Sequence, residues 1–129
     1  MKRPVGNPKA ARAVTETVRP RLRSDFRVSA LRRTAEADGL MAMIDRKGHE
    51  EAGIVFVKWV DGRKAWLFTE TSTETGMAWR ALSPKDGEDE PDVNRRLASE
   101  AEFDPDLWVV ELSGPIAKLD RHLEPLTED

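Results

Sequence analysis

The chain lacks several residues and patterns on which whole classes of function depend. None of its 129 residues is cysteine, which excludes a disulfide framework, a thiol nucleophile and a cysteine-ligated zinc site. Its two histidines, His49 and His122, are far apart in the sequence, whereas zinc sites without cysteine normally use two or three imidazoles. A chain without cysteine fits a reducing compartment, so we expect a cytoplasmic protein.

Long apolar runs and glycine-rich loops are missing as well. No apolar run approaches the roughly 18 residues that a membrane-spanning helix needs. Residues 1–20 begin with basic side chains but contain no continuous apolar stretch, so they do not resemble a secretory signal. The sequence Gly-x-Gly does not occur, and a phosphate-binding loop is therefore not expected. We expect no membrane contact and no cofactor.

What the chain has in abundance is charge, and the two signs are unevenly distributed. Charged residues make up 35% of the sequence and hydrophobic residues 39%. Residues 1–33 hold 10 basic and 2 acidic side chains, whereas residues 84–129 hold 5 basic and 14 acidic ones. This asymmetry predicts either a charged partner or two complementary surfaces.

The turn residues and the apolar periodicity predict a single α+β domain over residues 21–129, preceded by a basic, flexible arm over residues 1–20. A first helix is expected over 24–38, with Ser24 or Asp25 as its cap and Gly39 as its stop. The remaining elements are a buried strand over 40–45, a strand near 77–81, a helix over 91–102, a strand over 107–112 and a short tail helix near 116–123.

The best-specified unit is a pair of strands over 54–60 and 63–70 joined by Asp61-Gly62, a dipeptide typical of two-residue hairpin turns. This turn predicts that Val57 faces Trp66. Both faces of the pair are apolar, so we expect both to be covered. The predicted fold is α+β, with a mostly antiparallel sheet of about four to five strands, a central Asp-Gly hairpin and two flanking helices.

Three stretches in this order resemble a known family. They are Arg-Leu-Arg-Ser-Asp-Phe-Arg-Val-Ser-Ala (21–30), Ala-Gly-Ile-Val-Phe-Val-Lys (52–58) and Phe-Asp-Pro-Asp-Leu-Trp-Val-Val-Glu (103–111). Together they resemble the small bacterial proteins of domain of unknown function 1491, over roughly residues 21–112. The basic arm and the tail after Gly114 are additions to that pattern. The resemblance implies a shared fold and a cytoplasmic bacterial origin, and it implies no chemistry.

The opposite charges near the two ends define a candidate interaction surface. Arginines before and within the first helix could pair with the acidic segment 84–106, either in one chain or between two copies. The same arginines could grip phosphates of nucleic acid, but no aromatic residues are interleaved with them and no known reader motif is present. The candidate residues are Arg21, Arg23, Arg27, Arg32, Arg33, Glu100, Asp104 and Asp106.

No constellation of catalytic residues stands out. The carboxylates at 100, 102, 104 and 106 could hold a hard cation or act as an acid/base pair, but they lack calcium-loop spacing, and Asp104-Pro105-Asp106 is typical of a turn. His49 is expected at the solvated surface. The four tryptophans are expected in the core rather than in a ligand pocket. We assign no catalytic, cofactor-binding or metal-binding residue.

The sequence therefore favours a small non-enzymatic binding or regulatory module that acts through protein contacts, with self-association as one form. Nucleic-acid binding through the basic arm and first helix is the first alternative. An enzyme built on carboxylates and arginines, among them Arg23, Asp25, Asp104 and Asp106, is the second.

Overall fold

The computed structural model describes residues 22–124 and 126–127. The predicted arm over 1–20 and the candidate Arg21 lie outside this part of the chain. Neither α-helix in the described part is long and apolar enough to cross a lipid bilayer. The elements in order are α1 (Ser24–Ala37), β3 (Met41–Arg46), β4 (Val55–Asp61), β5 (Lys64–Thr73), β6 (Gly76–Ala81), β7 (Glu88–Asp89), α2 (Glu90–Phe103), β8 (Trp108–Ser113), the 3-10 helix η1 (Ile116–Arg121) and β9 (Leu126–Thr127).

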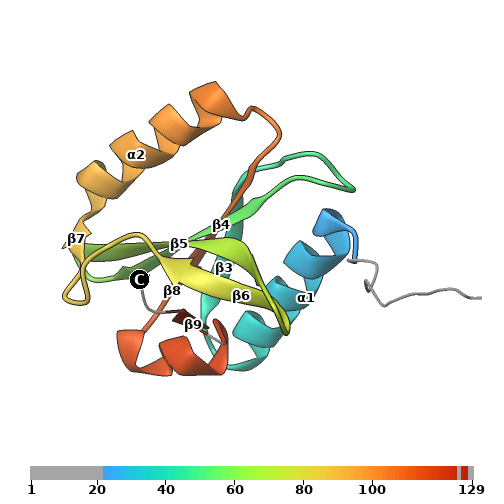
Figure 1. The fold of residues 1–129 in the computed structure, drawn as a ribbon. Coiled ribbons are helices and arrows are strands. Elements are labelled where there is room, and N and C mark those ends of the chain that lie inside the picture. Colours follow the sequence, from blue (N-terminus) through green and yellow to red (C-terminus); the bar gives the residue numbers. More distant parts are fainter. Residues whose placement is uncertain (1–21, 125, 128–129) are drawn as a thin grey trace, which may run out of the picture.

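The strands form one mixed sheet of seven, in the order β3-β8-β4-β5-β6-β9, with β7 paired to β5 (Figure 1). The α+β class is confirmed, but the prediction of a mostly antiparallel sheet with four to five strands is wrong. β8 runs parallel to β4 because the chain returns through α2 before it inserts between β3 and β4, and β9 runs parallel to β6. The strands β7 and β9 have two residues each, too few to show a periodic pattern.

The predicted Asp61-Gly62 turn is also wrong. β4 and β5 are antiparallel, but Asp61 pairs with Lys64, so Gly62 and Arg63 connect the two strands. Trp66 consequently faces Trp59 rather than Val57, a shift of two residues along β4. A shift of two preserves the alternation of side chains, so each strand still presents the predicted faces. The Asp61 carboxylate instead accepts a hydrogen bond from the Ile116 amide, 3.0 Å away, at the start of η1.

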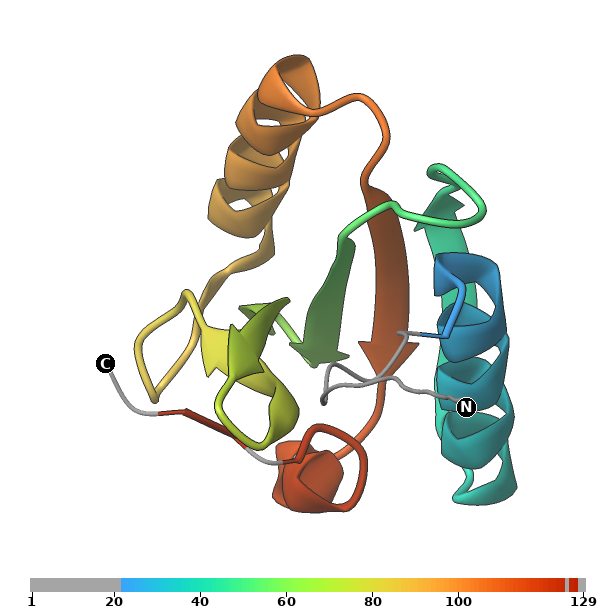
Figure 2. The same ribbon diagram turned by 45° about the vertical axis from the view of Figure 1, so that its right-hand side comes forward.

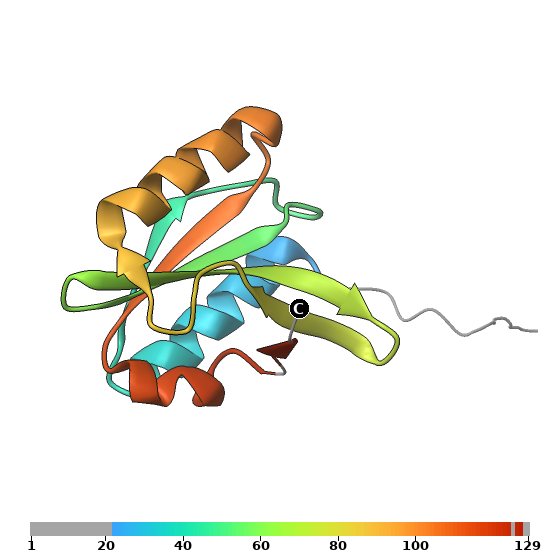
Figure 3. The ribbon, with the colours of Figure 1, turned by 60° about the vertical axis from the view of Figure 1, so that its left-hand side comes forward.

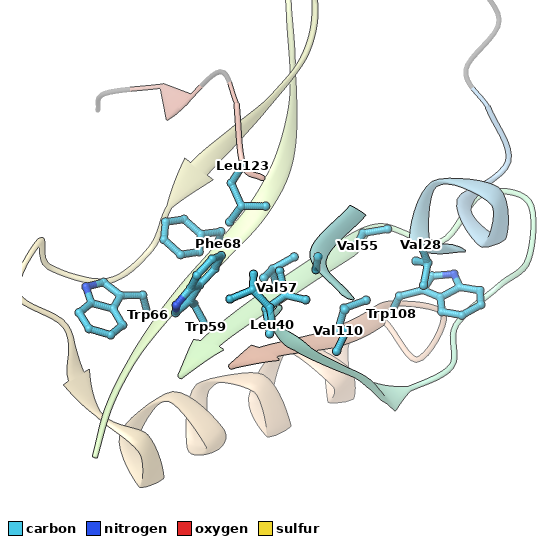
Figure 4. Close-up of a cluster of buried hydrophobic side chains, with 13 residues drawn as sticks. Val28, Leu40, Val55, Val57, Trp59, Trp66, Phe68, Trp108, Val110 and Leu123 are labelled. Carbon is cyan, nitrogen blue, oxygen red and sulfur yellow. The ribbon is translucent and has the colours of Figure 1, made fainter. Parts of the chain in front are cut away.

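The sheet is covered on both faces, as its two apolar faces predict. α1 and the C-terminal segment cover one face, and α2 covers the other (Figure 1, Figure 3). The α1-side core is built on Val57, Trp59 and Val110, which are fully buried, and Figure 4 shows the tryptophans of this cluster among aliphatic side chains. The α2-side core joins Val93 and Leu97 of α2 to strand residues that include Phe56, Leu67 and Val109.

The helix cap assigned to Ser24 is a further correction. Arg23 occupies the N-cap position, no side chain caps the helix, and Ser24 is its first residue. The Ser24 hydroxyl is buried and donates a hydrogen bond of 2.6 Å to the Gly53 carbonyl, so it ties α1 to the loop before β4. The predicted stop is confirmed, because Gly39 has φ +84° and the Leu40 amide returns to the Ala35 carbonyl.

The C-terminal segment is fixed to the end of α1 through Asp38. The Asp38 carboxylate lies 2.8 Å from Nε2 of His122 and accepts a hydrogen bond of 2.9 Å from Arg121. Lys118 donates to the Asp38 carbonyl at 2.6 Å. The hydrogen bond with His122, followed by the charges of Arg121 and Lys118, lowers the pKa of Asp38. Leu123, next to His122, is fully buried in the α1-side core.

Candidate functional site

Two of the arginines proposed as an interaction surface, Arg23 and Arg27, are paired with nearby acids. Arg23 donates to Asp25 at 3.2 Å, a contact that raises the pKa of Arg23 and lowers that of Asp25. Arg27 donates two hydrogen bonds to the Glu70 carboxylate in a bidentate pair, at 2.8 and 2.6 Å. Arg33 is exposed on α1, and the half-buried Arg32 has an Nε that is buried without a hydrogen-bond partner among the described residues.

The proposed acidic residues lie in α2 and in the turn that follows it. Glu100 is exposed on α2, and Asp104 accepts the Asp106 amide at 3.0 Å, which confirms the expected turn. α1 and α2 cover opposite faces of the sheet, and among the described residues no ion pair joins the α1 arginines to segment 84–106. Contact across two copies stays a prediction. In the same part of the chain, no group of three acidic or histidine side chains is arranged to hold a metal ion.

A charged cluster that the sequence reading missed lies beneath the start of α2. Lys58, in the middle of β4, is only 5% exposed at its side chain. Its ammonium group donates to Glu90 at 2.9 Å and to Asn94 at 2.8 Å, and lies 3.1 Å from Glu111 of the neighbouring β8. Asp45 of β3 lies 4.0 Å away. We call these five residues the lysine cluster.

The lysine cluster contains more carboxylates than cations. Burial alone would lower the pKa of Lys58, but its hydrogen bonds to Glu90 and Glu111 outweigh burial and raise it. Burial, with the neighbouring charge of Glu111, raises the pKa of Asp45, and the attraction to Lys58 offsets only part of this. Lys58 therefore stays charged, and its three donors are used by Glu90, Asn94 and Glu111. The cluster anchors α2 to β4 and β8.

One member of the lysine cluster, Asp45, lies where β3 stops being regular. The register between β3 and β8 shifts between Ile44 and Arg46, which leaves Asp45 as an extra residue in a β-bulge. Bulges redirect side chains, and this one turns Asp45 toward Lys58. The regular part of β3 is therefore Met41–Ile44, which we call the edge segment.

The edge segment lies at the border of the sheet (Figure 2) and is exposed, contrary to the predicted buried strand. Only Ala42 is buried, against α1, whereas Met41, Met43 and Ile44 are 66%, 50% and 39% exposed. The error has a physical cause: an apolar run predicts burial, but among the residues that the structure describes β3 has a neighbouring strand on one side only. The segment has no charge in a chain with 35% charged residues.

The backbone of the edge segment can be oriented from its neighbours. At the two ends of β8 the amides of Trp108 and Gly114 donate toward β4, so the alternate residues 109, 111 and 113 turn toward β3. Their partners Met41 and Met43 consequently bond to β8. The N–H and C=O groups of Ala42 and Ile44 point outward, away from the sheet.

Comparisons with known proteins agree with this fold. The chain is similar to a DUF1491 family protein from Caulobacter crescentus CB15, whose crystal structure matches at 39% identity and TM-score 0.66 over 73% of this chain and 89% of that one. An NMR structure of a DUF1491 family protein from the same organism matches at 38% identity and TM-score 0.68, over 83% and 97%. The solution structure of protein Atu0922 from A. tumefaciens matches at 28% identity and TM-score 0.66, over 74% and 87%.

The comparison with curated proteins gave no match. The family model described as "Protein of unknown function (DUF1491)" matches residues 22–119, which extends the predicted resemblance past Gly114 into η1. The fold, the three sequence stretches and this match agree, and the chain belongs to the DUF1491 family.

Proposed function

We propose that the protein is a non-enzymatic binding module that recognises another polypeptide by strand addition at the edge segment. The observation that carries this is the exposed, uncharged edge segment of β3 with its outward backbone donors and acceptors. Native proteins usually protect such edges with charges, prolines or covering elements, because an open edge pairs with other chains. The edge segment has neither charge nor proline, and among the described residues no element pairs with its outer side, although the bulge with its inward-pointing Asp45 limits it to four residues. A partner strand would cover this open stretch.

The neighbouring residues support this reading. Met41 and Met43 lie on the α2 side of β3, beside the carboxylates of Glu111 and Asp45. Methionine side chains adapt their shape to different apolar contacts. An incoming strand gains affinity from main-chain hydrogen bonds and selectivity from alternate side chains. The paired arginines and the turn at Asp104 offer less support to nucleic-acid binding or to a carboxylate enzyme.

Strand addition predicts binding of an extended peptide at β3. The probe is a synthetic peptide of alternating valine and threonine with a lysine at each end, added at millimolar concentration to the full-length, isotopically labelled protein. We expect amide chemical-shift changes concentrated in Met41–Arg46. A peptide with N-methylated alternate amides should have no effect, because it cannot form the ladder.

Two protein variants make this test specific. Ile44→Pro removes an N–H that points outward, and an edge strand tolerates proline at such a position. This substitution should abolish the chemical-shift changes. Ile44→Val keeps that donor and should retain them. Shift changes that are absent from β3, or that survive the Ile44→Pro substitution with the fold intact, would contradict the proposed function.

A further inference from the structure

We infer that the strand added to the edge segment is the edge segment of a second copy of this chain, in an antiparallel pair centred on Met43. This inference rests on the proposed function and names its partner. It follows from the symmetry that such a contact requires and from which residues of β3 carry charge.

A pair of identical antiparallel strands has a two-fold axis perpendicular to the sheet, so residues near the axis face themselves. A charged residue there would face its own copy, and like charges directly opposite destabilise a pair. The stretch from Leu40 to Ile44 contains no charged residue. The charges of β3 begin only at Asp45 and Arg46, where the bulge ends the regular strand. The edge segments of two copies can therefore pair without placing like charges opposite each other.

The direction of the backbone groups selects the register. Ala42 and Ile44 have outward N–H and C=O groups, so each must face a residue of the same kind to form hydrogen bonds. Centring the pair on Met43 places Ala42 opposite Ile44 of the second copy, and Ile44 opposite Ala42. Each of these two pairs exchanges both of its backbone hydrogen bonds. Centring on Ala42 would instead give one such pair and place Ile44 opposite Leu40.

The side chains fit the same register. On the α1 side the large Ile44, 39% exposed, would lie beside the small Ala42 of the second copy. On the α2 side Met43, 50% exposed, would contact Met43 of the second copy in a pair without mutual hydrogen bonds. In such pairs the Cα atoms are about 4.5 Å apart and the side chains are close. The contact would cover apolar surface that β3 leaves exposed.

Single cysteines test the register directly, because the chain has none of its own. We expect Met43→Cys to form a covalent dimer under mild oxidation with a glutathione buffer, since Cα atoms up to about 7 Å apart can be bridged. Met41→Cys should cross-link roughly tenfold more slowly, because the two copies of that position would be about 13 Å apart along the strands. Leu22→Cys is the control for chance collisions, because Leu22 is 66% exposed and so more accessible than Met43 at 50%.

Sedimentation completes the test. Sedimentation of the cysteine-free protein should show a concentration-dependent dimer that Ile44→Pro converts to monomer and Ile44→Val preserves. A monomer at all concentrations, or cross-linking at position 43 no faster than at position 22, would overturn the inference. If the peptide still adds to β3 in that case, the proposed function stands with a different partner. If the peptide also fails to bind, both the inference and the proposed function are contradicted.

Discussion

Replacing Lys58 with methionine is expected to lower the free energy of unfolding by about 2–4 kcal/mol at neutral pH. Methionine retains much of the apolar stem but removes the ammonium group that joins Glu90, Asn94 and Glu111. Two carboxylates and the nearby Asp45 would then lie close together without a cation. The expected loss in the free energy of unfolding is smaller than for a fully buried ion pair, because these carboxylates remain partly exposed.

The pH dependence of this loss has a definite sign. The Lys58→Met variant is destabilised because its carboxylates are ionised without a cation beside them. The loss in the free energy of unfolding should therefore be largest at neutral pH. It should shrink as the pH falls and Asp45, whose pKa is already raised, takes up a proton. Urea unfolding of both proteins over a pH series measures this difference.

Lys64→Met provides the matched control for this substitution. Lys64 is 54% exposed and lies 3.8 Å from Asp89, so its loss should cost less than about 1 kcal/mol. Equal and small losses for the two variants would show that the lysine cluster does not anchor α2. Lys58→Met should also alter the amide spectrum of β3, because Asp45 would lose the contact that directs its side chain inward.

The second large effect is expected at His122. Its side chain is 2% exposed, lies 6.1 Å from the Trp59 ring between centroids, and contacts Asp38 at 2.8 Å. Alanine at this position would leave a cavity beside Trp59 and remove one partner of Asp38. We expect a loss of about 2–3 kcal/mol in the free energy of unfolding.

The other histidine is the natural comparison. His49 is exposed in the loop before β4, where its Nδ1 accepts the amides of Glu51 and Ala52. His49→Ala should cost less than about 1 kcal/mol, because water can replace these contacts. Tryptophan fluorescence during thermal unfolding separates the two variants. Similar melting temperatures for both would contradict the role assigned to His122 in fixing the C-terminal segment.

The local sequence pattern predicts many of the helices and strands, but it does not predict the edge segment or the lysine cluster. The helices near 24–38 and 91–102 follow from periodicity and turn residues, and the strands that contain Trp59 and Trp66 follow from their β-branched and aromatic composition. The predicted faces of β4 are correct although the predicted turn is wrong, because the register differs from the prediction by two residues. The parallel insertion of β8 between β3 and β4 depends on long-range packing, which no local pattern specifies.

The site depends on the same long-range packing. The apolar run 40–45 has the composition of a buried strand, and only the strand order shows that it lies at the edge. Lys58 was a usable signal, because a lysine within Ile-Val-Phe-Val-Lys-Trp-Val must either reach solvent or find partners. Its partners Asp45, Glu90 and Glu111 come from three other elements, so their identity could not be read from the sequence.

Residue-resolved amide hydrogen exchange at low and high protein concentration tests strand addition at the edge segment most directly. We expect the amides of Ala42 and Ile44, which point outward, to become more protected as the concentration rises. The amides of Met41 and Met43 already bond to β8 and should show little change, so they serve as internal references. Exchange at Ala42 and Ile44 that is fast and independent of concentration would contradict pairing of two copies through β3.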